Sequence, residues 1–313
     1  MHSPLSSLKE GRWFKLICGA SFQDLPAVRN LTLAYALAGA DCIDVAADPS
    51  VIAAAQKALL VASGQSTEAQ QRGFGKVAKM SPWLMVSLND GEDPHFRKAE
   101  FNRADCPTNC PRPCESICPA QAIVFPPGVI AERCYGCGRC LPVCPSQLIG
   151  TRSYVSTPQA IAPLVLSTGV DAVEIHTQVG RLSGFERLWR AIAPWVNQLK
   201  LVAISCPDGD SLTEYLWSLY DLISPLPCPL IWQTDGRPMS GDIGDGTTRA
   251  AVKLGQKVLA MGLPGYVQLA GGTNSHTVTK LRASGLLEEG TFWSRGSRGS
   301  KPPSLFHFRC SLR

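Results

Sequence analysis

The sequence predicts an α/β protein, a TIM-like (β/α) barrel whose loops carry a cysteine-rich insertion. Short, continuously apolar runs alternate with amphipathic segments of about 10 to 15 residues, which is typical of buried parallel strands joined by helices. Seven such units can be counted along the 313 residues, and this number favours a barrel over a three-layer sheet. Eight of the 13 cysteines lie between Cys106 and Cys144, after the third expected strand.

Each apolar run marks an expected strand, and each amphipathic run marks an expected helix. The strands are expected at residues 14–18, 42–46, 83–88, 172–176, 199–205, 229–233 and 266–270. The helices are expected at residues 25–38, 51–62, 157–166, 184–195, 212–223, 247–260 and 277–284. Because barrels carry insertions in the loops that follow their strands, we expect the cysteine-rich segment to leave the barrel there.

An eighth strand is hard to find, so the barrel is predicted to be incomplete at its C-terminal end. From Gly290 the chain is rich in Ser, Arg, Gly and Pro, and its strand-like apolar run is confined to residues 305–308. A flexible tail explains this composition, and a truncated or frame-shifted barrel end is the alternative. The predicted parts are the N-terminal barrel units at 1–96, the insertion at 97–152, the C-terminal barrel units at 153–288 and the atypical tail at 289–313.

Composition excludes several classes of protein. Hydrophobic residues make up 45% and charged residues 18%, with a mean hydropathy of +0.02, which excludes a disordered chain. The net charge of +5 comes without a run of Lys or Arg, so no nucleic-acid partner is expected. No apolar stretch reaches the roughly 18 residues of a membrane span, and no secretory signal is visible. We therefore expect a soluble, intracellular protein with no membrane span.

The cysteine window predicts metal binding. An odd number of cysteines without a secretory signal argues against a disulfide scaffold. The second half of the cysteine window reads Cys134-x2-Cys137-x2-Cys140-x3-Cys144-Pro. The two-residue gaps let one tight loop wrap three thiolates around an iron–sulfur cube, and the two glycines of this loop allow left-handed turns. The fourth cysteine lies beyond that reach and would ligate a partner cluster.

The segment repeats itself with a period of 26 residues. Residues 114–123 and 140–149 both read Cys-x3-Cys-Pro-x-Gln-x-Ile. This duplication resembles the bacterial two-cluster ferredoxins, and the resemblance implies a ferredoxin-like domain with two [4Fe–4S] clusters and crossed ligands. One cluster would be held by Cys118, Cys134, Cys137 and Cys140. The other would be held by Cys106, Cys110, Cys114 and Cys144.

The first half departs from the ferredoxin spacing. Its gaps are C-x3-C-x3-C-x3-C, and Pro107, Pro111 and Pro113 exclude a helix, so the extra residues are expected in loop turns. A three-iron or labile cluster is the alternative to [4Fe–4S] in this half. For the whole window the alternative is two structural zinc sites, but zinc ribbons use two separated pairs of cysteines. Iron–sulfur is therefore favoured.

The local charge of the insertion is positive. Between Arg97 and Arg152 there are seven Lys or Arg residues and four Asp or Glu residues. Nearby positive charge favours the more negative reduced cluster and should raise its reduction potential. Such a potential would suit a redox sensor.

The barrel offers weaker candidates. Gly271 and Gly272 end the last expected strand, where barrels often hold a phosphate, including that of flavin mononucleotide (FMN); a tight turn explains them equally well. Polar residues also lie near the C-terminal strand ends, where barrel enzymes keep catalytic groups. They are Asp44, Asn89, Glu174, His176, Cys206, Asp235 and Arg237. Without an anchoring motif we favour satisfied polar residues in a vestigial site and assign no catalytic residue.

The whole pattern resembles the LdpA (light-dependent period) family of cyanobacteria, which has relatives in plants. The resemblance rests on the barrel interrupted by the two-cluster segment and on TDGRPMSGDIGDGTTRAA at Thr234–Ala251. It extends from about Phe14 to Leu287 and leaves out the tail after Glu289. It implies an iron–sulfur protein that reports the redox state set by light-driven electron flow to the circadian clock. It also implies clock-input signalling proteins as partners and a cytoplasmic location. An electron-transfer partner or a quinone is a further expectation.

Two functions remain from the sequence. The first is a redox sensor whose clusters change state and so change a partner-binding surface. The alternative is a flavin-linked oxidoreductase of the dihydropyrimidine or dihydroorotate dehydrogenase type, in which the clusters pass electrons to a barrel-bound FMN. The paired glycines support the oxidoreductase, and the missing eighth strand counts against it. We favour the sensor.

Overall fold

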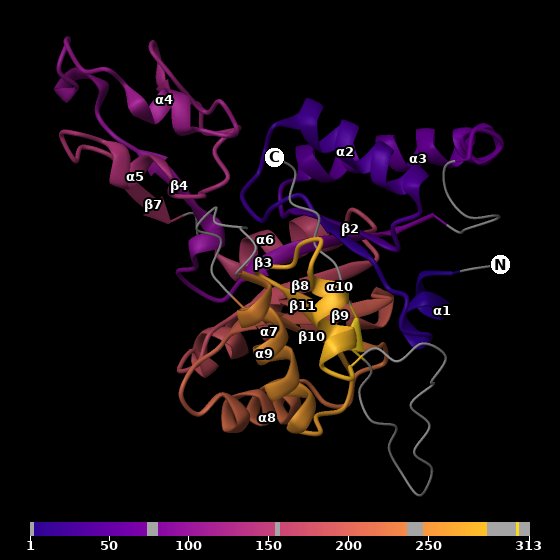
Figure 1. Cartoon of the computed structure of the whole chain (residues 1–313). Coiled ribbons are helices and arrows are strands. Elements are labelled where there is room, and N and C mark those ends of the chain that lie inside the picture. The colour runs from indigo at the N-terminus through magenta and orange to yellow at the C-terminus, as the bar shows by residue number, and fades with distance from the viewer. Residues whose placement is uncertain (1–2, 74–80, 154–156, 237–246, 287–304, 307–313) are drawn as a thin grey trace, which may run out of the picture.

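A computed structural model of the chain describes residues 3–73, 81–153, 157–236, 247–286 and 305–306. Its centre is an eight-stranded sheet in which all neighbouring strands are parallel (Figure 1). The strands follow chain order across the sheet: β1 (Lys15–Ile17), β2 (Cys42–Ala46), β3 (Trp83–Asn89), β8 (Ala172–His176), β9 (Leu201–Pro207), β10 (Leu230–Asp235), β11 (Tyr266–Ala270) and β12 (Leu305–Phe306).

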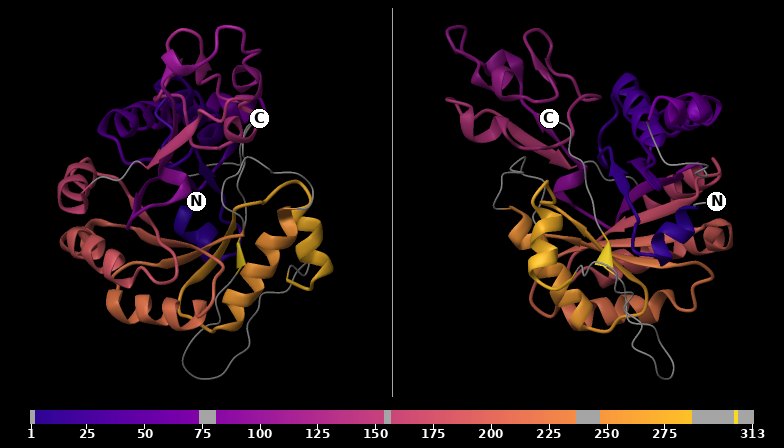
Figure 2. Two further views of the ribbon diagram at one scale, coloured as in Figure 1. Left: turned by 90° about the vertical axis from the view of Figure 1, so that its left-hand side faces the viewer. Right: turned by 45° about the vertical axis from the view of Figure 1, so that its right-hand side comes forward.

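Helices pack on the outer face of this sheet, as both views in Figure 2 show. They are α2 (Leu25–Ala38), α3 (Pro49–Gln71), α6 (Pro158–Leu166), α7 (Leu182–Ile192), the 3-10 helix η3 (Ala193–Gln198), α8 (Leu212–Ile223), α9 (Thr247–Ala260) and α10 (Thr277–Ala283). Helix α1 (Pro4–Lys9) packs instead against inward side chains of the strands. Capping residues in the local sequence determine where several of these helices begin and end. The Asp24 side chain accepts a hydrogen bond from the Ala27 amide at the start of α2, and Gly39 ends it in the left-handed region.

The sheet is strongly curled, and contacts between side chains of distant strands inside it show this. Trp13, just before β1, donates its indole N–H to Gln268 of β11 at 2.8 Å. Lys15 of β1 bonds to Glu174 of β8, three strands away, a separation of about 14 Å in a flat sheet. The predicted TIM-like architecture is confirmed in this curled form. No ladder joins β12 to β1 in the part of the chain that the structure describes.

Period-two alternation divides the strands into an outer and an inner face. Outward side chains such as Val45, Val86 and Val173 pack with the helices in the main hydrophobic core. Inward side chains at the N-terminal end of the strands are apolar and pack against Leu8 of α1. Those nearer the C-terminal end are polar and buried: Lys15, Asp44, Ser87, Glu174, Ser205, Gln233 and Gln268. The barrel therefore has an apolar floor and a polar interior.

The structure changes some predicted boundaries. The eighth strand exists within the apolar run of the tail, where β12 pairs with Val267 and Gln268 of β11. Helix α3 continues past residue 62 to Gln71, because Gln, Ala and Glu favour helix without an apolar stripe. Helix α7 ends at Ile192, since Pro194 interrupts its hydrogen bonds, and a 3-10 helix follows.

The cysteine-rich segment leaves the barrel between β3 and β8, which nonetheless pair directly with each other. It projects from the C-terminal end of β3 to one side of the sheet (Figure 1, upper left). Its elements are η1 (Pro94–Phe96), β4 (Arg97–Glu100), η2 (Arg103–Asp105), α4 (Pro113–Ile117), β5 (Ile123–Val124), β6 (Gly128–Val129), α5 (Cys140–Val143) and β7 (Gly150–Ser153). The expectation of no helix after Cys106 was wrong at Pro113, which starts α4 because the first helical position needs no N–H.

Of the helices that the structure describes, not one is both long enough and apolar enough to cross a membrane.

Candidate functional site

The cysteine segment is built from two similar halves. Cys114 lies in α4 and Cys140 lies in α5, and both side chains are buried. Cys118 and Cys144 end these helices with nearly the same backbone angles, φ −76° and ψ 107° against φ −71° and ψ 112°. The glutamine three residues further on has a positive φ in both halves, 49° and 52°. The sequence repeat is therefore also a structural repeat.

Short strands hold the two halves together. β4 pairs antiparallel with β7, joining the beginning of the segment to its end. β5 pairs antiparallel with β6 between the two cysteine motifs. A small core of alanine, isoleucine and cysteine side chains, including Ala122 and Ile149, lies between these strands and the helices. The segment thus has a core of its own, to which several cysteines belong.

The thiols of the segment interact in two sets. Electrostatic interactions connect the members of a first thiol set, Cys106, Cys110, Cys114 and Cys144. They also connect the members of a second thiol set, Cys118, Cys134, Cys137 and Cys140. Each set joins three cysteines of one half to the last cysteine of the other half. The four cysteines of the second thiol set also line one pocket.

Most of the shifted thiol pKa values in these sets lie above the ordinary range. Burial, followed by the neighbouring Cys137 and Cys134, raises the pKa of Cys140 to about 12. Burial and the nearby Cys110 likewise raise the pKa of Cys106. Cys144 differs, because backbone N–H groups of residues 146–149 outweigh its burial and lower its pKa. A metal cation among these thiols would favour their thiolate forms.

Backbone N–H groups point at several sulfur atoms. The amide of Ala99 on β4 lies 3.3 Å from Cys134 Sγ, and the amide of Ala122 lies 3.2 Å from Cys118 Sγ. The amide of Arg112 lies 3.5 Å from Cys110 Sγ. Hydrogen bonds of this kind stabilise thiolate sulfur and tune the potential of a metal cluster.

The loop of the second thiol set requires glycine at Gly136. Its φ is 73°, and a Cβ there would lie 2.2 Å from the backbone oxygen of Arg97. Arg97 also donates its Nε–H to the Gly136 carbonyl at 3.2 Å. The loop is thus held against β4, next to Cys134 and Cys137.

A second polar assembly lies inside the barrel around Lys15. Its ammonium group bonds to Glu174 and lies 3.4 Å from Asp44, with all three side chains 1% exposed. Burial lowers the pKa of Lys15, but the charges of Glu174 and Asp44 outweigh it, so the pKa is raised overall. Burial raises the pKa of Asp44 to about 7. The lysine charge is thus balanced within the chain.

Glu174 continues this assembly toward the C-terminal strand ends. Its Oε1 accepts hydrogen bonds from Gln233 at 2.5 Å and pairs with His176 Nε2 at 3.0 Å. The expectation that Glu174 and His176 point to the same side of their strand is thereby confirmed. Burial opposes ionisation of Glu174, but Lys15 and then His176 hold its pKa well below the usual range. The charges of Glu174 and, to a lesser degree, Asp93 outweigh burial and raise the pKa of His176 to about 9.

Of the other polar candidates of the barrel, Asp235 is linked to this assembly through Ser205, whose hydroxyl accepts a hydrogen bond from Gln233 at 3.1 Å. Asp235 accepts a hydrogen bond from Ser205 inside the barrel. Asn89 accepts from the Gly91 amide at 2.8 Å in the turn after β3. Cys206 points outward into the hydrophobic core, and burial raises its pKa. Arg237 lies outside the described residues.

Gly271 and Gly272 form a buried turn after β11, with φ values of 59° and 122°. The hydroxyl of Thr248 donates to the Gly272 carbonyl at 3.3 Å. The positive φ values explain why glycine stands at both positions. Binding of a flavin phosphate there stays a prediction.

Sequence reasoning missed Lys15, Asp93 and His95. Lys15 lies in the first strand, and its alternation with Trp13 was a usable signal for an inward side chain. Asp93 and His95 precede the insertion without a recognisable motif. They lie next to His176 because they follow the end of β3, which pairs directly with the end of β8.

Comparisons with known proteins identify the family. Residues 106–155 match the LdpA Fe-S cluster-binding domain, and residues 164–301 match the Light dependent period A C-terminal domain. Light dependent period A of Synechococcus elongatus is 54% identical over 284 residues, which cover 91% of this chain and 77% of that protein. The chain belongs to the LdpA family.

The LdpA-family chain is therefore an iron–sulfur protein, since the matched cluster-binding domain spans all eight cysteines of the segment. Among solved structures, the apo form of the homocysteine methyltransferase MmuM from Escherichia coli aligns over 99% of this chain and 95% of that chain. The sequence identity is 12% and the TM-score is 0.45.

Proposed function

We propose that this chain holds two [4Fe–4S] clusters in a ferredoxin-like segment and reports the cellular redox state to the circadian clock input. One observation carries the proposal: the eight thiols of the segment interact as two sets of four. A four-iron cluster takes four cysteine thiolates, so the donor sets fit two such clusters in number and chemistry. The crossed composition of the sets is the pattern of two-cluster ferredoxins.

The first thiol set would hold one cluster and the second thiol set the other. The second set has the tighter surroundings, with amides directed at Cys118 and Cys134 and the loop of Gly136 held against β4. The first set has longer gaps between its cysteines, which are spanned by a turn at residues 108–109 and an irregular stretch before α4. We expect it to be the more labile of the two.

When bound, the clusters would supply one-electron oxidation and reduction. The chain sets the conditions for that chemistry. Its amides donate to sulfur, and its seven basic residues outnumber four acidic residues between Arg97 and Arg152. Both features favour the more negative reduced state, so they raise the reduction potential. We propose that the segment therefore changes oxidation state within the range of potentials found in the cell.

The clock role rests on the relative. The name of the Synechococcus elongatus protein ties it to a light-dependent period, and 54% identity extends the same role to this chain as a proposal. Clock-input signalling proteins in the cytoplasm would then be the partners. An electron-transfer protein or a quinone would exchange electrons with the segment. A free-energy difference of about 1.4 kcal/mol between the oxidised and reduced states would change partner affinity tenfold.

The cluster proposal is tested by metal analysis of the chain purified without oxygen. We expect eight iron and eight labile sulfide per chain, as two four-iron, four-sulfide clusters require. Cys140→Ser should remove about half of both, whereas Cys228→Ser, which alters a half-buried barrel cysteine outside both sets, should remove none. Stoichiometric zinc without labile sulfide would refute the proposal.

The clock role is tested by replacing the relative in Synechococcus elongatus with this chain. We expect the wild-type chain to restore a light-dependent period and Cys140→Ser to fail, with Cys228→Ser as the matched control. Tight stoichiometric FMN with steady turnover of a substrate would instead support the flavin-linked oxidoreductase. If the Cys140→Ser chain restored the same light-dependent period as the wild-type chain, the sensor role would be refuted.

A further inference from the structure

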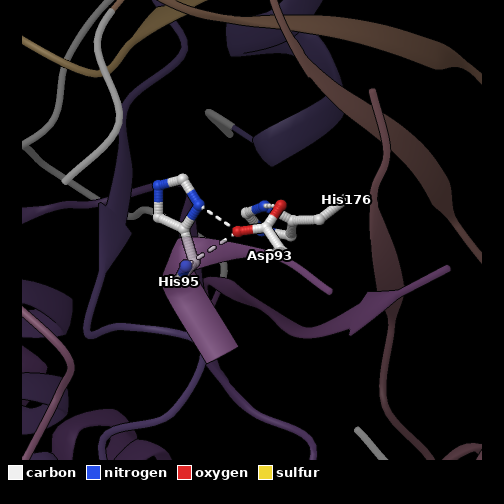
Figure 3. Close-up of side chains that lie close together, drawn as sticks. All are labelled: Asp93, His95 and His176. Carbon is white, nitrogen blue, oxygen red and sulfur yellow. Dashed lines mark hydrogen bonds and ion pairs between the residues drawn. The ribbon is translucent and has the colours of Figure 1, made fainter. Parts of the chain in front are cut away.

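We propose that Asp93, His95 and His176 bind one divalent first-row transition-metal ion where the cysteine segment joins the barrel. Figure 3 shows the three side chains turned toward one another, two from the connector after β3 and one from the end of β8. Each offers a ligand atom, and these atoms all lie within 4.8 Å of one another. The site is separate from both thiol sets.

Local structure places the two connector ligands. Asp93 caps the 3-10 helix η1 by accepting a hydrogen bond from the His95 amide at 2.7 Å. This turn brings His95 Nδ1 to 2.6 Å from Asp93 Oδ1. His176 Nδ1 lies 3.9 Å from the other carboxylate oxygen. Donors that each lie about 2.1 Å from one ion are about 3 to 3.5 Å apart, so the observed separations bracket those of a loaded site.

The imidazole of His176 supplies the independent sign of a missing ligand. The side chain is 7% exposed, yet its Nδ1 has no hydrogen-bond partner. An orphaned buried nitrogen is costly. This nitrogen lies 3.9 Å from Asp93 Oδ2, beside the ring of His95, whose centroid is 5.0 Å from that of His176. A metal ion between them would satisfy it.

The support behind His176 is that of a metal ligand. Its Nε2 faces Glu174 Oε1 at 3.0 Å, and Glu174 is held in turn by Lys15 and Gln233. Ligating histidines usually donate their second N–H to a carboxylate, which fixes the tautomer and the ring orientation. The buried charge network of the barrel thereby acquires a role, which is to present Nδ1 of His176 to the ion.

The donor set selects the class of ion. Two imidazoles and one carboxylate suit Zn²⁺ or Fe²⁺, whereas Mg²⁺ prefers oxygen ligands throughout. Three protein ligands leave further coordination positions for water or a small oxygen ligand. Because β4 begins at Arg97, two residues after His95, the ion would tie the base of the cysteine segment to the barrel.

Metal analysis of the full chain tests the site without reference to activity. The chain is loaded with Zn²⁺ or Fe²⁺ without oxygen, desalted, and assayed for metal and labile sulfide. We expect the wild type to retain one equivalent of metal more than His95→Ala or Asp93→Asn, with equal sulfide in all three. The Asn variant keeps the helix cap, so it guards against misfolding. His276→Ala, on an exposed residue of the barrel, is the control and should keep the ion.

Thermal unfolding gives the second readout. Zn²⁺ should raise the Tm of the wild type and of His276→Ala but leave the Tm of Asp93→Asn unchanged. Mg²⁺ should raise the Tm of none of the three proteins. Equal metal content in the wild type and Asp93→Asn would overturn the proposal. An equal Tm shift in those two proteins would also overturn it.

Discussion

The barrel and the cysteine segment handle their reactive groups in opposite ways. In the barrel, burial raises the pKa of Cys18 to about 12 and that of Cys228 to about 11, so these thiols stay protonated. The buried ammonium of Lys15 is balanced by two carboxylates of the same chain. In the segment, thiols lie close to one another in two sets, and their mutual interaction raises the pKa of Cys106 and Cys140. The charge of Lys15 is thus balanced by the polypeptide itself, whereas the segment depends on a ligand that the polypeptide does not supply.

Removing the iron should therefore separate the two regions most strongly. We expect a chelator with an oxidant to unfold residues 97–153 and to leave the barrel folded, because metal binding contributes on the order of 10 kcal/mol to small metal domains. Hydrogen exchange read by mass spectrometry should show protection lost in α4 and α5 and kept in β2 and β8. Equal loss in both regions would show that the barrel also depends on the clusters.

Lys15→Met should have the converse effect, destabilising the barrel and sparing the segment. The substitution leaves Asp44 and Glu174 buried without their cation, which typically costs about 3 to 5 kcal/mol. Denaturant unfolding measures the loss, and iron and sulfide content should stay at the wild-type value. Lys200→Met is the matched control, since the Lys200–Asp171 pair is half exposed and worth less than about 1 kcal/mol. A Lys15 variant as stable as this control would contradict the buried network.

Gly136→Ala should act on the segment alone, with a smaller effect. The residue has φ 73°, and an added Cβ would meet the Arg97 carbonyl at 2.2 Å, so we expect about 2 to 3 kcal/mol of strain and loss of the second cluster. Gly73→Ala is the control, because its φ is 82° but no atom lies within 4 Å of the added Cβ. That change should cost about 1 kcal/mol and leave the iron content unchanged. Iron loss in both variants would point to backbone strain without the clash.

The contrast also explains how far each region could be predicted. The thiol sets were predictable because their ligands lie within 39 residues, so that motif spacing reflects local geometry. Their crossed grouping came from the resemblance to ferredoxins, and the electrostatic neighbours agree with it. The strands were predictable to within about two residues from apolar runs, since burial on both faces leaves a continuous signal.

The barrel interior was not predictable in the same way. Lys15 and Glu174 are 159 residues apart in sequence, and they meet only because the sheet curls. The meeting of Asp93 and His95 with His176 depends instead on the direct pairing of β3 with β8, across the whole cysteine-rich segment. The tail shows another limit, because β12 is two residues long and is stabilised by pairing with β11 rather than by its own sequence. Non-local geometry of this kind leaves no spacing to read.

The smallest expected effect on the fold concerns the reactivity of Cys228. Burial raises its pKa from 9.0 to about 11, so at pH 8 its thiolate should be about 100-fold rarer in the folded chain than in urea. Because the folded pKa is the higher one, the stability contributed by this thiol is complete below pH 9 and is lost as the pH rises through 11. We therefore expect iodoacetamide to label Cys228 slowly at pH 8 and about tenfold faster for each unit up to pH 10, as read by peptide mass spectrometry. Removing the iron should expose Cys134 and Cys137 to the reagent and leave the rate at Cys228 unchanged. Faster labelling of Cys228 after iron removal would show that the barrel thiols, too, are protected by the clusters.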